Sequence, residues 1–259
     1  MSKKVKKIKN KKNKSKIICL TAYSKNIASI LDKYCDLILV GDSLGSVLYN
    51  YKSTKEVTLD IMINHSKSVR QGVKKSLMVV DMPYNSYRNS KEALKNAKSV
   101  MKKTKCDAVK LEGGKKIVPI VRILIKNKIP VMGHLGILPQ TEKKFTFKGK
   151  KIHEINRILK DAKLLEAAGI FSVVLECVEK KLAKKITKQL KIPTIGIGSS
   201  VNCDGQVLVI DDLIGLSQSK FRFVKKYVNI NKVINSAVKK YRSEVLTKQF
   251  PSNKHSFKN

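Results

Sequence analysis

Short apolar runs alternate with longer amphipathic segments along most of this chain, and this alternation limits the possible folds more than any other feature. Eight such runs follow one another: KIICLTAY, DLILVGDS, SLMVVDMP, DAVKLEGG, IPVMGHLG, FSVVLECV, IPTIGIGS and QVLVIDDL. Segments with helical spacing, such as SKEALKNAKSVMKK and INRILKDAKLLEAAG, lie between most of them, and Gly169 is a predicted helix stop. Nearly continuous apolar strands separated by helices indicate a parallel sheet that is covered on both faces.

The number of these units predicts a closed α/β barrel. About eight strand and helix units in 259 residues fit a (β/α)8 TIM barrel better than an open doubly wound sheet. No linker rich in Pro, Gly or Ser divides the chain, so we expect a basic N-terminal tail over 1–16 and a single barrel domain over 17–259. The tail is expected to be disordered or a short helix, and INSAVKKYRSEVL is predicted to form a C-terminal helix.

The strongest signal in the composition is charge, since 55 Lys and Arg against 19 Asp and Glu give a net charge of +36. Such a value suggests a polyanionic partner. The lysines, however, are spread over almost every predicted helix, and no motif or basic patch interleaved with aromatic residues collects them. We therefore expect a solvated basic surface and no specific nucleic-acid partner.

The chain has no feature of an exported or membrane protein. Its five cysteines include no C-x-x-C pair, no apolar stretch approaches the roughly 20 residues that span a bilayer, and no leader peptide opens the sequence. A cytoplasmic protein without a membrane partner is the expectation.

Polar side chains stand where the predicted strands end. In chain order they are Asp42 with Ser43, Asp81, Lys110 with Glu112, His134, and Glu176. The carboxyl ends of barrel strands meet at one mouth, where the active sites of such barrels lie. Carboxylates from separate strands, with few histidines nearby, suit a hard cation such as Mg2+.

Each of these side chains also has a purely structural explanation. Asp42 could cap the following helix, and Asp81 before Met-Pro could be a turn residue. Lys110 could form an ordinary ion pair with Glu112, and His134 could be a hydrogen-bonded core residue. These explanations do not account for the coincidence of so many polar residues at one rim.

Several motifs together resemble the ketopantoate hydroxymethyltransferase family. They are LVGDSLGSV, VTLDIMINH, VVDMPYNSY, AVKLEGG, IPVMGHLGILPQ, VVLECV, IPTIGIG, DGQVLV and FPSNKHSF, in order from about Ile17 to Phe257. The resemblance implies a barrel of the phosphoenolpyruvate/pyruvate type. It also implies transfer of a hydroxymethyl group from 5,10-methylenetetrahydrofolate to 3-methyl-2-oxobutanoate, which gives 2-dehydropantoate in pantothenate synthesis.

The same resemblance implies a metal centre and a proton-transferring residue. Asp42 in GDS and Asp81 in VDMP look like ligands of one Mg2+ per subunit, and Glu112 in KLEGG looks like the residue that completes the metal environment. Glu176 in LEC looks like the residue that moves the proton of the keto acid.

Substrate contacts are implied for the neighbouring side chains. Ser43 and Lys110 look like contacts to the keto acid, beside the metal-held contacts through Asp42 and Asp81, and His134 in GHLG lies near the substrate in a supporting role. The resemblance further implies a ring-shaped homo-oligomer, a decamer, whose only other partners are the 2-oxo acid and the folate.

The sequence departs from the family pattern at three places. TAYS has Ser24 where the family commonly has Asp, GIGSS has Ser199 and Ser200 where the family has Ala and Gly, and the segment after Gln140 is short. We expect these changes to affect the folate side of the mouth and not the metal residues.

Two other functions compete with this interpretation. A related barrel enzyme could act on a 2-oxo acid as a lyase or mutase without folate, and a test for folate-dependent consumption of the keto acid distinguishes the two. Alternatively, the barrel could be a scaffold that binds polyanions through residues 1–16.

Overall fold

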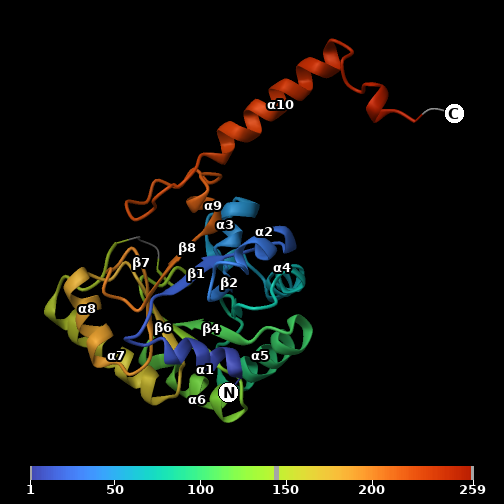
Figure 1. The fold of residues 1–259 in the computed structure, drawn as a ribbon. Coiled ribbons are helices and arrows are strands. Elements are labelled where there is room, and N and C mark those ends of the chain that lie inside the picture. Colours follow the sequence, from blue (N-terminus) through green and yellow to red (C-terminus); the bar gives the residue numbers. More distant parts are fainter. Residues whose placement is uncertain (1, 143–145, 258–259) are drawn as a thin grey trace. The chain divides into compact units, whose positions relative to one another are not determined.

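Eight parallel strands close into a barrel in chain order in the computed structural model, which describes residues 2–142 and 146–257. Each of the eight apolar runs contains one strand, so the predicted barrel is confirmed (Figure 1). The strands are β1 (Ile17–Thr21), β2 (Leu37–Val40), β3 (Leu77–Asp81), β4 (Ala108–Glu112), β5 (Val131–Gly136), β6 (Ser172–Glu176), β7 (Thr194–Ile197) and β8 (Gly205–Leu208).

Helices surround the strands (Figure 1). In the barrel they are α1 (Lys3–Asn10), α2 (Lys25–Leu31), α3 (Leu44–Tyr49), α4 (Leu59–Gly72), α5 (Ser90–Thr104), α6 (Val118–Lys126), α7 (Ile152–Ala167) and α8 (Lys180–Gln189), with 3-10 turns η1 (Thr54–Glu56) and η2 (Lys115–Ile117). The chain passes from β7 to β8 through residues 198–204 without a helix. The last repeat is therefore shorter than the alternation predicts.

The apolar residues of the strands and helices form the core between sheet and helices. Every residue of β2, β3, β4 and β7 is buried, as expected for a sheet covered on both faces. On α5 the buried residues follow helical spacing, at Ala93, Ala97, Val100 and Thr104. Gly169 follows the end of α7 with a φ of +101°, which confirms the predicted helix stop.

The chain divides into two compact units, residues 1–209 and 210–259. Residues 1–16 belong to the first unit together with the barrel strands, and the single domain over 17–259 stays a prediction. The second unit contains α9 (Ile210–Leu213), α10 (Ile230–Leu246) and η3 (Asn253–His255), and α10 includes the predicted helix INSAVKKYRSEVL. None of the described helices is long and apolar enough to cross a membrane.

The basic N-terminal segment is a docked helix, so of the two expected states, a disordered tail and a short helix, the structure has the short helix. Ser2 caps α1 by accepting a hydrogen bond from the Val5 N–H at 3.3 Å. Val5 and Ile8 are buried, at 0% and 2% exposure. Two apolar residues at a spacing of three give this short helix one face that packs on the barrel.

Lysines next to that face pair with aspartates that precede strands. Lys11 Nζ lies 2.6 Å from Asp36 Oδ1, just before β2, and Lys12 Nζ lies 2.8 Å from Asp204 Oδ2, just before β8. The N-terminal segment therefore covers the amino ends of the barrel strands, opposite the carboxyl ends where the candidate site residues stand. Part of the chain's large positive charge therefore forms ion pairs at the amino ends of the barrel strands.

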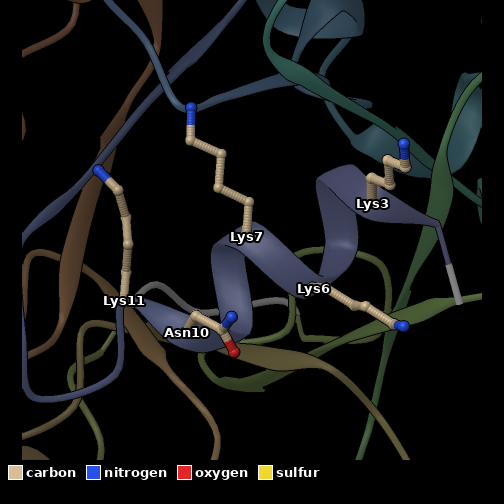
Figure 2. A pocket seen from close by; sticks show the side chains of 5 residues that line it. All are labelled: Lys3, Lys6, Lys7, Asn10 and Lys11. Carbon is tan, nitrogen blue, oxygen red and sulfur yellow. The ribbon is translucent and has the colours of Figure 1, made fainter.

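A basic surface lies beside α1. A shallow hollow beside the helix is lined by Lys3, Lys6, Lys7, Asn10 and Lys11 (Figure 2). It contains none of the candidate catalytic side chains, and Lys3, Lys6 and Lys7 in its lining are exposed. The hollow is therefore part of the basic surface, and we do not propose it as a binding site.

Removal of residues 2–16 should destabilise the barrel. Exposing the sites of Val5 and Ile8 costs about 3 to 6 kcal/mol, which corresponds to a loss of roughly 10 °C in Tm. Calorimetry of the truncated protein tests this. A full-length control with Lys3, Lys6 and Lys7 changed to Gln should melt within a few degrees of the parent, and equal Tm values for parent and truncated protein would show that the helix contributes no stability.

Candidate active site

The loop after β2 brings Asp42 and Ser43 to the mouth of the barrel. A Cβ on Gly41 would lie 2.9 Å from Ser43 Oγ, so a larger residue at this position would displace the Ser43 side chain. The Asp42 N–H donates a hydrogen bond to Asp81 Oδ2 at 3.2 Å, and Asp42 is 5% exposed. Ser43 is the N-cap residue of α3, so the described contacts of Asp42 do not include a helix cap.

A buried ion pair joins the next two strands. Register places Asp81 of β3 opposite Lys110 of β4, and Lys110 Nζ lies 3.0 Å from Asp81 Oδ1. Only 5% and 3% of the two side chains are exposed. Burial lowers the pKa of Lys110, but the nearby carboxylates of Asp81, Glu112 and Asp42 raise it by more than burial lowers it. The pKa therefore lies above the usual value, and the ammonium form persists.

His134 lies between two carboxylates from neighbouring strands. Its Nδ1 is 3.3 Å from Glu112 Oε1 and its Nε2 is 3.2 Å from Glu176 Oε2. Nε2 thus lies at ion-pair distance from Glu176, but it forms no well-aligned hydrogen bond with any of the described residues. Burial and Lys110 lower the pKa of His134, but the two glutamates outweigh them and raise it to about 9.

Gln140 completes the site, although the sequence did not single it out for this role. Its Nε2 donates to Asp42 Oδ2 at 2.7 Å, and its backbone N–H donates to Glu112 Oε2 at 3.1 Å. Tyr87 donates its hydroxyl hydrogen bond to Gln140 Oε1. In the sequence, Gln140 ends the LPQ segment and lies four residues after β5. Nothing in the residue pattern shows that this loop folds back over the mouth.

Negative charge accumulates at the centre of this cluster. Burial raises the pKa of Asp42, and the nearby Asp81 and Glu112 add to the effect, so the pKa reaches about 8. Burial likewise raises the pKa of Asp81 despite the Lys110 ammonium. The pKa of Glu112 is lowered in spite of its burial, chiefly by His134. A cation between Asp42 and Asp81 would lower the pKa of both carboxyl groups, because it stabilises their ionised forms.

The donor chemistry of the site fits a hard cation held by oxygen. Oδ1 of Asp81 accepts no well-aligned hydrogen bond from the described residues, and Asp42 and Asp81 lie side by side. In the described ranges, no group of three or more His, Cys, Asp or Glu side chains is arranged to hold a metal by itself. Glu112 faces His134 and Gln140, so any further ligands must come from water or substrate.

The serines at which the chain departs from its family make local contacts. Ser24 begins α2 without a side-chain cap, Ser199 Oγ donates to Val178 O at 3.1 Å, and Ser200 Oγ accepts from the Asn202 N–H at 3.2 Å. Their effect on folate binding stays a prediction. The segment after Gln140 lies partly outside the described residues, which end at 142 and resume at 146.

The fold is that of a class of (β/α)8 barrels with solved structures. A putative phosphonomutase from Burkholderia cenocepacia matches with a TM-score of 0.67 at 9% identity, over 93% of this chain and 100% of that chain. A 2,3-dimethylmalate lyase, a member of the PEP mutase/isocitrate lyase superfamily, matches with a TM-score of 0.59 at 10% identity, over 80% and 79%. At these identities the likeness shows the fold alone, and it confirms the predicted barrel type.

The family follows from closer relatives. The model of the ketopantoate hydroxymethyltransferase family matches residues 2–253. A 3-methyl-2-oxobutanoate hydroxymethyltransferase from Pelagibacter ubique is 68% identical over 257 residues, which cover 99% of this chain and 100% of the relative. Another from Rhizobium etli is 48% identical over 247 residues, which cover 93% and 90%. The chain belongs to the ketopantoate hydroxymethyltransferase family, and it is a transferase of pantothenate biosynthesis.

The raised pKa of Asp42 predicts how pH affects the stability of the metal-free protein. The folded carboxyl keeps its proton up to about pH 8, while the unfolded one loses it near the ordinary value of 3.8. The parent therefore loses up to ~1.4 kcal/mol per pH unit between these values relative to a variant that cannot ionise. Calorimetry in EDTA should show the Tm advantage of Asp42→Asn growing from pH 5 to 8 and constant above it.

Asp32 offers a matched control for that experiment. Burial raises its pKa, but hydrogen bonds from the backbone N–H groups of Ser76, Lys75 and Lys74 outweigh this and lower it. Asp32→Asn should therefore differ from the parent by a constant amount between pH 5 and 8. A pH-independent difference for Asp42→Asn as well would refute the buried, proton-holding state of Asp42.

Proposed function

We propose that this enzyme transfers a hydroxymethyl group from 5,10-methylenetetrahydrofolate to 3-methyl-2-oxobutanoate and so forms 2-dehydropantoate. Family membership supports the reaction. The observation that carries the proposal is the convergence at one mouth of Asp42, Asp81 and the Lys110 ammonium with the separate Glu176 carboxylate. Asp42, Asp81 and Lys110 can together bind an anionic 2-oxo acid, while Glu176 accepts a proton.

Asp42 and Asp81 are assigned to the binding of one Mg2+, and Glu112 is assigned to its outer environment. When bound, the ion supplies Lewis acidity toward the oxygens of the 2-oxo acid and makes the C3 proton easier to remove. Glu112 suits the outer position because one of its oxygens faces His134 and the other accepts the Gln140 N–H.

Lys110 and Ser43 are assigned to the substrate. The Lys110 ammonium is buried and permanently charged, so it can balance the carboxylate of the keto acid without water competing for it. Ser43 Oγ lies 2.8 Å from the Tyr23 hydroxyl, and this contact orients it at the partly exposed edge of the mouth.

Glu176 is assigned the proton transfer at C3. Its side chain is 13% exposed, against 3% for Asp81 and for Glu112, so it is the more accessible carboxylate for a substrate. His134, with its pKa raised to about 9, carries a positive charge at neutral pH and faces Glu176 at 3.2 Å. We therefore assign His134 to holding the Glu176 side chain in place for proton transfer.

The carbon–carbon bond forms after this proton transfer. The C3 carbon of the enolate attacks the methylene carbon of the folate, a C–C bond forms, and the C–N bonds of the methylene group break. Water supplies the oxygen of the new hydroxyl group, and tetrahydrofolate leaves. The folate donor, a homo-oligomeric assembly and a cytoplasmic location all remain predictions for this chain.

Glu176→Gln should separate binding from proton transfer. The variant keeps the size of the side chain but lacks a basic oxygen, so keto-acid binding should persist while exchange of the C3 proton with solvent deuterium slows by roughly 100-fold or more. NMR follows this exchange without folate, and the parent rate should require Mg2+ and stop in EDTA. A variant that exchanges the proton at the parent rate would remove Glu176 from the enolisation step.

A further inference from the structure

We propose that Gln140 and Tyr87 act together as positioning residues that orient the carboxylates of Asp42 and Glu112 for a divalent cation. The inference rests on the proposed function, because it assumes that Asp42 helps to hold the ion. Neither Gln140 nor Tyr87 contacts the reacting atoms in this account, and both act through the side chains that they hold.

Gln140 connects two carboxylates that come from different strands. It is 1% exposed, and its Nε2 donates to Asp42 Oδ2 at 2.7 Å and to Met82 O at 3.0 Å. Its backbone N–H donates to Glu112 Oε2 at 3.1 Å. A single buried residue thus sets the orientation of carboxylates after β2 and at the end of β4.

Tyr87 holds the acceptor end of the Gln140 amide, while Asp42 and the Met82 carbonyl hold the donor end. A glutamine amide has a donor end and an acceptor end that are nearly equal in shape, so the surroundings must select one orientation. The Tyr87 oxygen accepts a long hydrogen bond from the Glu112 N–H at 3.4 Å, and the hydroxyl donates to Gln140 Oε1. The amide NH2 group is therefore directed at Asp42. Without the hydroxyl, Gln140 Oε1 loses its donor, and the amide is held less firmly against Asp42.

The neutral amide suits a metal site better than a second cation would. The Gln140 donor engages Oδ2 of Asp42, and in this proposal Oδ1 is the oxygen left for the ion. A lysine in place of the amide would cancel the charge that attracts the ion. Hydrogen bonds of this kind to ligand side chains typically contribute a factor of 10 to 100 in metal affinity.

Titration with Mn2+ tests the inference directly, because the paramagnetic resonance of the free ion reports binding without turnover. Tyr87→Phe should weaken Mn2+ binding about 10-fold, and Gln140→Met about 10- to 100-fold. The double variant should bind no more weakly than Gln140→Met, since Tyr87 acts only through Gln140. Tyr84→Phe is the matched control, because this tyrosine lies in the same loop and its ring contacts Lys55 instead.

Circular dichroism and the Tm in EDTA show whether each variant is folded, and if Gln140→Met does not fold, Tyr87→Phe alone decides. A parent that binds no Mn2+ would overturn the proposed function itself. If the parent binds and folded Tyr87→Phe and Gln140→Met bind equally well, this inference fails while the proposed function stands. Additive losses in the double variant would refute the claim that Tyr87 acts through Gln140.

Discussion

The buried ammonium group of Lys110 is the interaction on which the site depends. It lies 3.0 Å from Asp81 Oδ1 and 3.3 Å from His134 Nδ1, and it is the buried lysine of the described chain. This charge stands among carboxylates that come from the loop after β2, from β3 and from β4, and it offsets part of their repulsion. Removing one partner of such a buried pair typically costs 3 to 5 kcal/mol, so the barrel must hold Lys110 to hold the site.

The lysine does not neutralise the cluster completely, and the remaining charge explains the rest of the arrangement. Asp42 keeps a proton to about pH 8, and the neutral Gln140 amide orients its carboxyl group without adding a positive charge to the cluster. The protein's own positive charges therefore do not fully balance the carboxylates of the site, and a bound cation can balance the rest. The other end of the barrel differs, because there partly exposed lysines such as Lys11 meet aspartates in a solvated setting.

The sequence predicted what depends on periodicity. Strands buried on both faces leave apolar runs, parallel strands bring their carboxyl ends to one edge, and the two-residue period puts Lys110 and Glu112 on one face, so the strand-end residues could be placed together in advance. Gln140 and Tyr87 lie in loops, whose paths leave no periodic signal. The docking of α1 depends on Asp36 and Asp204, which are distant in sequence, and only two apolar residues mark its buried face.

The central claim is that Asp42 and Asp81 exchange a proton for a divalent cation. Calorimetric titration with Mg2+ at pH 7, in two buffers of different ionisation enthalpy, counts the protons that leave as the ion binds. The account predicts a release close to one proton per ion at pH 7, because the pKa of Asp42 is raised to about 8, and almost none at pH 9.5. Binding without proton release at pH 7 would contradict it.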